Sequence, residues 1–194
     1  TQKLVEFSRN SENIEKVDES IDSLEVVSSE EGFGENHKYY LASLYEKQGS
    51  FKKSSGLIWE ILDKEPKNAH AWNFLAYSLI ERGQNLDKAY EYINKAVEIS
   101  PKDGFIRDSL GWYYFKVGKV DKALDELEKA VKHEPTDVSI QKHLAVIYTF
   151  KKDFGSAKKF IVEALKHVKQ ESERQELYDA LKQIEAKRVP ASFK

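Results

Sequence analysis

The sequence contains no cysteine and no methionine, and only four prolines and nine glycines among its 194 residues. Without cysteine the chain forms neither disulfides nor thiolate metal sites, which suits the cytoplasm and the bacterial periplasm or envelope equally. It has no run of about 18 apolar residues that could span a membrane, and no basic start followed by an apolar stretch marks a signal peptide. The composition predicts one soluble helical unit and leaves its compartment open.

Motifs that carry catalysis are missing as well. The five histidines are scattered with no pair at metal-ligand spacing, and the one His-Glu pair, His133-Glu134, is followed by a proline. We interpret the histidines as surface residues. No nucleophile elbow, Walker loop or dinucleotide fingerprint occurs, and the glycines of segment 31–34 lack the preceding strand and following lysine of a phosphate loop. We therefore predict a chain that is not an enzyme and needs neither a metal nor a cofactor.

What the sequence does contain is a repeated pair of helices, best seen in residues 104–137. Its first half places Leu110 and Tyr114 on one helical face, a turn follows at Gly118, and a second apolar stripe leads to a proline. The pattern returns with a period of 34 residues, with one extra residue after Gly83. Neither helix can bury its stripe alone, so such pairs become stable by stacking on similar neighbours.

Each recurring residue type has a physical reason. A small residue in the first helix allows two helix backbones to approach closely, and a glycine at the turn can take the left-handed conformation that ends a helix. A proline closes the second helix because it lacks an amide hydrogen. The small residues are Ala42, Ala76, Gly111 and Ala145, the turn glycines are Gly49, Gly83 and Gly118, and the closing prolines are Pro66, Pro101 and Pro135.

This pattern resembles the tetratricopeptide repeat family, whose signature is Trp-x2-Leu-Gly-x2-Tyr, then Ala-x3-Phe, then Pro. The resemblance covers about Glu35 to Glu171, and the run Asp108 to Trp112 with Gly118 is similar to bacterial members, some of them envelope-associated. It implies an all-α fold, a right-handed α-solenoid of about four helix pairs. The fourth copy departs from the signature, since it lacks the turn glycine and the closing proline.

The repeats divide the chain into seven predicted segments. An apolar stripe in the first segment indicates a helix that starts near Ser11, and Ser172-x2-Gln175 indicates a capping box that opens the last helix. Thr1 is not a natural initiator, so we expect a trimmed or mature form and leave open whether repeats or a leader precede it. The segments are a partial repeat with linker (1–34), four repeats (35–68, 69–103, 104–137 and 138–171), a capping helix (172–188) and a tail (189–194).

In the family the first helices of successive repeats line an inner wall on which partners bind, so the resemblance implies a peptide-binding groove. The positions on this wall are aromatic and apolar at its middle, edged by polar groups. The predicted groove residues are Tyr39, Asn73, Tyr77, Phe105, Asp108, Trp112, Phe115 and Lys142. An alternative is that the aromatic residues pack between neighbouring helices, and it is left open. The inward positions at which chaperone-binding members hold a terminal carboxylate supply no cations here.

The leading hypothesis is therefore a non-catalytic scaffold for protein or peptide partners, and two alternatives stand beside it. One is an accessory subunit of an enzyme or nucleic-acid complex, because the fourth repeat carries seven lysines against three acidic residues. The whole chain has a net charge of −2, however, which favours a solvated lysine face over contact with phosphates.

The other alternative is self-assembly. Residues 1–34 hold nine acidic against three basic residues, so the two ends of the chain carry opposite charge and attract one another head to tail. The apolar tail adds a segment suited to an aromatic groove in a homo-oligomer. Its predicted contact residues are Val189, Pro190 and Phe193.

Overall fold

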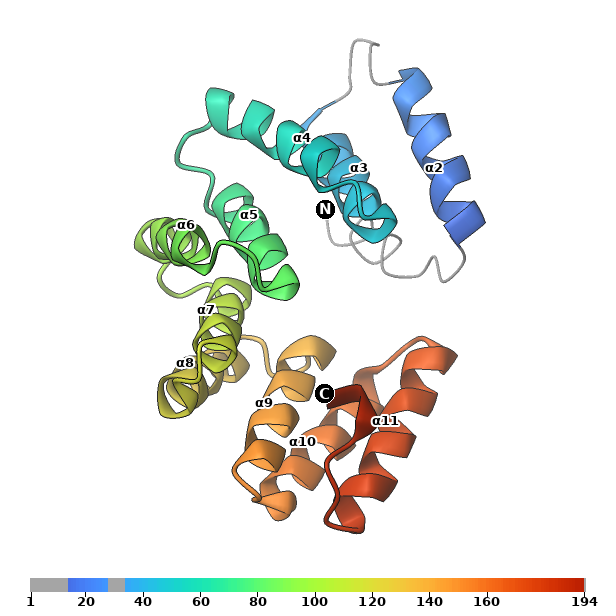
Figure 1. Cartoon of the computed structure of the whole chain (residues 1–194), viewed down its shortest axis with the longest axis vertical. Coiled ribbons are helices and arrows are strands. Elements are labelled where there is room, and N and C mark those ends of the chain that lie inside the picture. The colour runs from blue at the N-terminus through green and yellow to red at the C-terminus, as the bar shows by residue number, and fades with distance from the viewer. Residues whose placement is uncertain (1–13, 28–33, 194) are drawn as a thin grey trace.

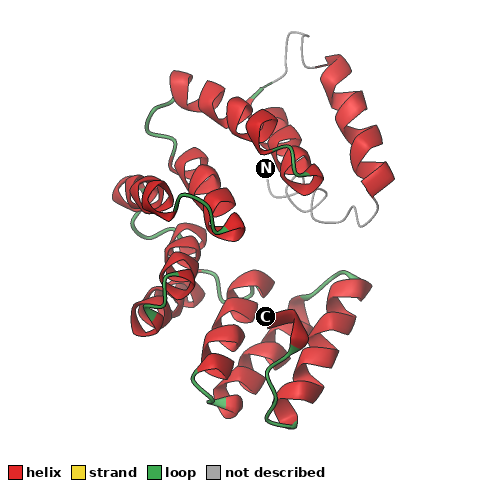
Figure 2. Cartoon of the chain, in the orientation of Figure 1, coloured by secondary structure: helices red, strands yellow, loops and turns green. Residues whose placement is uncertain are grey.

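A computed structural model describes residues 14–27 and 34–193, and these residues form helices joined by short loops (Figures 1 and 2). This confirms the predicted all-α class. The predicted helix start near Ser11 and residues 31–33 of the predicted linker 31–34 lie outside the described residues. The α-helices are α2 (Ile14–Val27), α3 (Glu35–Gln48), α4 (Phe51–Lys64), α5 (Ala69–Arg82), α6 (Leu86–Ile99), α7 (Gly104–Lys116), α8 (Val120–His133), α9 (Val138–Phe150), α10 (Phe154–His167) and α11 (Glu171–Glu185), and a short 3-10 helix, η1 (Ala191–Phe193), ends the described chain.

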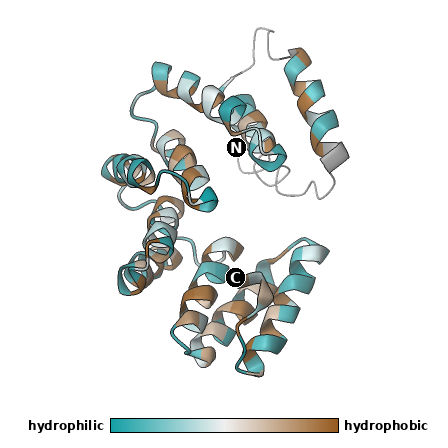
Figure 3. Cartoon of the chain, viewed as in Figure 1, coloured by the Kyte–Doolittle hydropathy of each residue, from teal (hydrophilic) through white to brown (hydrophobic). Residues whose placement is uncertain are grey.

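The helices pack as consecutive pairs, α3 with α4, α5 with α6, α7 with α8 and α9 with α10. The first helices of neighbouring pairs also touch, since α5 contacts α7 and α7 contacts α9. The pairs follow one another along an open curve, with α11 closing the C-terminal end (Figure 1). Hydrophobic and hydrophilic residues alternate along the helices (Figure 3), and the buried apolar residues form clusters between neighbouring helices. The molecule is a solenoid whose core is built one interface at a time.

Two helices of the third pair approach closely where the sequence has its smallest residue. A side chain added at Gly111 would bring Cβ to 2.7 Å from Cγ of Leu127 and 3.1 Å from the carbonyl oxygen of Ala123. Real Cβ atoms do not tolerate such a distance, so α7 and α8 pack against bare backbone there. The corresponding Ala42, Ala76 and Ala145 are fully buried.

The turns within the pairs use the left-handed conformation. Gly49, Gly83 and Gly118 have φ angles of 81°, 61° and 77°, as their residue type predicts. In the fourth pair the same position is Lys152, which adopts a φ of 61° without being glycine. The fourth pair therefore has the same left-handed turn conformation as the others, although its turn residue is not glycine.

A side-chain hydrogen bond to a backbone carbonyl recurs at the joints between pairs. Asn68, Asp103 and Asp137 first cap α5, α7 and α9, each accepting a hydrogen bond of 3.0 Å from the backbone N–H three residues on. In each of these helices, and in α11, one side chain also donates a hydrogen bond to the backbone carbonyl oxygen six residues earlier in the chain. These bonds, which we call carbonyl latches, are Trp72 to Pro66 (2.9 Å), Arg107 to Pro101 (2.8 Å), Gln141 to Pro135 (2.7 Å) and Arg174 to Val168 (2.6 Å).

The start of α11 differs from the prediction. The helix begins at Glu171 after Gln170, whose side chain makes no capping bond, so the predicted capping box at Ser172 and Gln175 is wrong. The carbonyl latch of Arg174 occupies this joint instead, because its guanidinium holds the end of the preceding pair. Tyr178, on the same helix, is 45% exposed.

Candidate partner-binding groove

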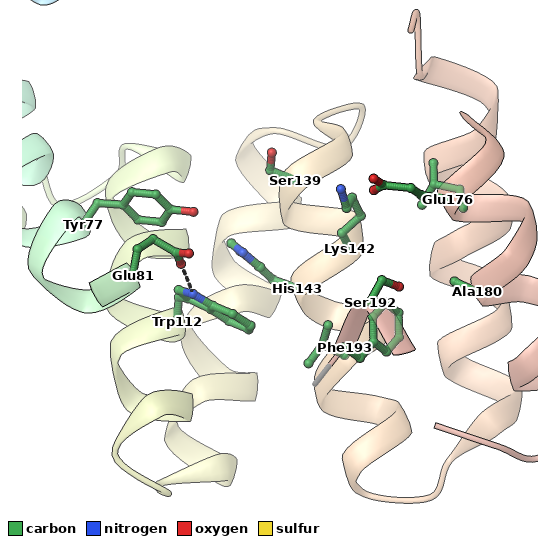
Figure 4. Close-up of a pocket in the computed structure, with 12 residues that line it drawn as sticks. Tyr77, Glu81, Trp112, Ser139, Lys142, His143, Glu176, Ala180, Ser192 and Phe193 are labelled. Atoms are coloured by element: carbon green, nitrogen blue, oxygen red, sulfur yellow. Dashed lines mark hydrogen bonds between the residues drawn. The ribbon is translucent and has the colours of Figure 1, made fainter. Parts of the chain in front are cut away.

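A cavity of about 300 Å³ opens on the inner side of the solenoid, where α5, α7, α9 and α11 converge (Figure 4). It is lined by side chains from all four helices and from the tail. The lining residues are Tyr77, Glu81, Trp112, Ser139, Lys142, His143, Val146, Glu176, Leu177, Ala180, Ser192 and Phe193. Three of the predicted groove residues, Tyr77, Trp112 and Lys142, are among them.

Trp112 ties three inner helices together at this cavity. Its indole Nε1 donates a hydrogen bond of 2.5 Å to Oε1 of Glu81 on α5 (Figure 4). Its ring stacks on His143 of α9 at 4.1 Å between centroids and on Phe115 of its own helix at 5.2 Å. The side chain thus combines the two expected roles of the aromatic residues, because it packs between helices and also lines the cavity.

His143 is an inward residue, which corrects the interpretation of all the histidines as surface groups. Its side chain is 12% exposed, and Nδ1 lies 2.7 Å from Oδ1 of Asp108 on α7. Asp108 is itself 7% exposed, so this predicted groove residue directs its carboxylate at the histidine. The one signal of this contact in the sequence is the spacing of 35 positions between the two residues, about one repeat length.

The charged groups at the cavity differ in how they are partnered. Lys142 Nζ pairs with Oε1 of Glu173 on α11 at 3.2 Å, which offsets its charge. Glu81 and Glu176 are exposed, and both line the cavity. Sequence reasoning missed these two carboxylates because single acidic residues on a helix carry no motif. With the histidine and the lysine each facing a carboxylate, the cavity is acidic.

The remaining predicted groove residues, Tyr39, Asn73, Phe105 and Phe115, do not line this cavity. Tyr39 donates a hydrogen bond of 2.9 Å to Oδ1 of Asn68, and burial, followed by the charge of Glu35, raises the pKa of its phenol. Phe105 is 38% exposed, and Phe115 packs edge-on against Phe150, which is 63% exposed. Asn73 is half-buried, and its Oδ1 has no hydrogen-bond partner among the described residues. Their role in binding stays a prediction.

The tail lies against its own chain. Pro190 is buried, Val189 is 48% exposed, and Phe193 packs on the core between α9, α10 and α11. The C-terminal end of the described chain thus lies on the inner side of the solenoid (Figure 1). The sequence predicted that this segment enters the aromatic groove of a second copy of the chain, and that contact between copies stays a prediction.

The lysines of the fourth pair are largely matched by carboxylates. Lys151 pairs with Asp121 at 2.7 Å, and Lys158 pairs with Glu185 at 2.6 Å. Lys166 pairs with Glu163 at 2.6 Å, and this lysine, together with His167, lowers the pKa of the glutamate. Pairing of this kind is typical of a solvated helix face.

The described residues contain no group of three side chains suited to hold a metal ion. Within the same ranges, no helix combines the length and the apolar character needed to cross a membrane.

Comparisons with known proteins bear on the family. A family model described as tetratricopeptide repeat matches residues 39–104. A TPR repeat-containing protein of Pseudomonas aeruginosa is 34% identical over 85 residues, which are 44% of this chain and 14% of that protein. The chain therefore spans only about one seventh of the length of this curated relative.

Solved structures share the fold at low sequence identity. A thermophilic TPR protein in Thermus thermophilus superposes with a TM-score of 0.75 at 18% identity, covering 93% of this chain and 97% of that one. PilW, a widely conserved type IV pilus biogenesis factor, gives 0.68 at 18%, with 100% and 86% covered. The pilF protein of Pseudomonas aeruginosa gives 0.63 at 15%, with 99% and 87% covered.

Proposed function

Because the chain is a tetratricopeptide repeat protein, a member of a typically non-catalytic family that mediates protein-protein interactions, we propose that it binds a segment of another protein along its inner face. The observation that carries this proposal is the half-open cavity of about 300 Å³ at which four inner helices converge. Its lining mixes aromatic rings, apolar side chains and carboxylates, the combination by which a peptide groove gains both affinity and orientation.

The arrangement supports binding along the inner face in a second way. Neighbouring inner helices are joined by Trp112 and by the Asp108 to His143 contact, so the wall of the cavity is held in place before a partner arrives. A preformed wall lowers the ordering cost that binding must overcome.

A displayed library of random 16-residue peptides tests this function. Sequences enriched on the immobilised chain are synthesised, and their dissociation constants are measured by isothermal titration calorimetry. Ser139→Arg fills the cavity from the first turn of α9, whereas Ser23→Arg places the same side chain at an exposed position on α2, none of whose residues lines the cavity. We expect Ser139→Arg to weaken binding at least about tenfold and Ser23→Arg to leave it unchanged.

Circular dichroism melting of both variants shows whether they remain folded. The proposed function is wrong if no sequence is enriched, or if enriched peptides bind the folded Ser139→Arg variant as tightly as the unaltered chain.

Self-assembly is a second candidate, supported by the opposite charge of the two chain ends. The tail lies against its own chain, so assembly through Phe193 would require that the tail leave its own groove for that of a neighbour. Light scattering over a concentration series at low salt tests this candidate. A mass that stays monomeric at every concentration contradicts it.

A further inference from the structure

The C-terminal tail forms one side of the cavity in which the proposed function places a partner. Ser192 and Phe193 line the cavity beside Lys142 of α9 and Ala180 of α11 (Figure 4). The Phe193 ring packs on the apolar core of the last helices, so it covers surface that a partner side chain would otherwise contact. Tail and partner therefore compete for the same wall.

The tail is held far more weakly than the helix that precedes it. One hydrogen bond of 3.1 Å, from the backbone N–H of Ala191 to Oε1 of Gln183, joins η1 to α11, and it is exposed to solvent. The hydrogen bond from Phe193 to the carbonyl of Pro190 stays within the tail itself. Beside these bonds, the buried ring of Pro190 and the aromatic ring of Phe193 hold the segment by packing.

Helix α11, in contrast, is fixed at both ends. The guanidinium of Arg174 donates to the carbonyls of Leu165 and Val168, at 3.2 and 2.6 Å. Near its other end, Glu185 pairs with Lys158. The tail can thus leave the cavity while α11 keeps the last helix pair covered.

The chemistry of the cavity indicates what would replace the tail. Glu81 and Glu176 line it, while Lys142 faces Glu173 and His143 faces Asp108, so the wall carries an excess of negative charge beside the site of the aromatic ring. The tail sequence itself matches this chemistry, because the aromatic Phe193 is followed directly by a lysine. An aromatic residue next to a basic one suits both the apolar surface under the ring and the carboxylates beside it.

Building on the proposed function, we propose that the tail is a tethered competitor for the groove, and that the partner segment carries an aromatic residue adjacent to a lysine or arginine. A tethered segment competes at an effective concentration set by its short linker, in the millimolar range. Only a partner segment with more contacts along the inner wall than the tail has would displace it. The tail therefore sets an affinity threshold for partners.

The probe for this proposal is a fluorescein-labelled peptide with the sequence of residues 187–194, titrated with the full chain and followed by fluorescence anisotropy. In the unaltered chain the tethered tail blocks the probe. Phe193→Ala removes the competing ring, and we expect this variant to bind the probe at least about tenfold more tightly. Val189→Ala, which alters an exposed tail residue that does not line the cavity, is the matched control and should leave probe binding unchanged.

Two altered probes and one further variant test the stated chemistry. A probe with alanine in place of its phenylalanine, and one with glutamate in place of its final lysine, should each bind the Phe193→Ala chain at least about fivefold more weakly. Glu176→Gln added to Phe193→Ala should weaken the original probe, whereas Glu98→Gln, an exposed glutamate on α6, should not. A chain that lacks residues 191–194 replaces Phe193→Ala if that variant melts at a lower temperature.

The outcomes separate this proposal from the proposed function. Equal probe binding to the unaltered chain and to Phe193→Ala, or to its shortened replacement, overturns the tail as a competitor. If the library peptides bind the cavity while the probe binds neither chain, the groove function stands and the tail proposal is wrong. If neither library peptides nor the probe bind, both are wrong.

Discussion

The third and fourth helix pairs have the same architecture but solve its local problems with different residues. In the third pair, α7 and α8, the close approach is made by Gly111 against Leu127. In the fourth pair, α9 and α10, the equivalent residues are Ala145 and Ile161, both fully buried. The turn residue differs too, Gly118 in the third pair and Lys152 in the fourth, with similar positive φ angles.

What the two pairs share is the packing and not the residue. The branching carbon of Leu127 would lie only 2.7 Å from a Cβ at position 111, so the third pair needs glycine. The other pairs combine alanine with isoleucine: Ala42 with Ile58, Ala76 with Ile93 and Ala145 with Ile161. The size of the residue in the first helix thus depends on the shape of the side chain that faces it from the second helix.

The largest effect is expected from Gly111→Leu. A leucine side chain must fit where a single Cβ already lies 2.7 Å from Leu127, so the α7 to α8 interface must separate. We expect a loss of about 3 kcal/mol or more in the free energy of unfolding, measured by urea denaturation. Gly56→Leu, on an exposed helix face with no atom near its Cβ, is the control. If Gly111→Leu is as stable as the unaltered chain, the contact with Leu127 does not limit the size of the side chain at position 111.

A double-mutant cycle tests the pairing of residues directly. Gly111→Ala alone should cost about 1 to 2 kcal/mol, because the new Cβ displaces the Leu127 side chain. Gly111→Ala with Leu127→Ile reproduces the alanine and isoleucine pair of the other repeats and should recover at least about half of that loss. Additive effects of the two changes in urea denaturation would contradict the pairing.

The turn residues give the next effect. Lys152→Gly replaces a residue held at positive φ, so we expect the chain to gain about 1 kcal/mol in the free energy of unfolding. Gly118→Lys in the third pair should lose a similar amount. Lys151→Gly, one position earlier at a φ of −71°, is the control and should not stabilise the chain. If Lys152→Gly lowers the stability instead, the contacts of the lysine side chain stabilise the fold by more than the positive φ angle destabilises it.

The smallest effect concerns pH. In the third pair, burial and then a hydrogen bond with Tyr90 raise the pKa of the Tyr114 phenol to about 12. In the fourth pair, burial and then a hydrogen bond with Glu128 raise the pKa of the Tyr148 phenol. A phenol with a raised pKa in the folded state stabilises the fold fully below about pH 10, its unfolded value, and loses this contribution as the pH rises to about 12. The stability difference between the unaltered chain and Tyr114→Phe should therefore fall over this range. A difference that stays constant would contradict it.

The helix pairs and the close approach at Gly111 could be predicted from the sequence because they rest on local residue types repeated at a fixed period. The left-handed conformation of Lys152 could not, since nothing in a lysine marks it, and the surrounding turn imposes it. The contact of His143 with Asp108 joins two helices whose relative position only the packed structure defines. The prediction of a capping box at the start of α11 was wrong for a related reason. There the guanidinium of Arg174 bonds the carbonyl oxygen of Val168, a contact that the capping pattern does not indicate.

The carbonyl latches also bear on how the solenoid responds to force. Each latch joins the end of one helix pair to the first helix of the next, and the four joints lie in series along the chain. Since the contacts between the described helices run mainly from one pair to the next, a load applied to the two ends passes through every joint in turn. We therefore expect the chain to recover its curvature after a small extension and to separate one helix pair at a time under a large one.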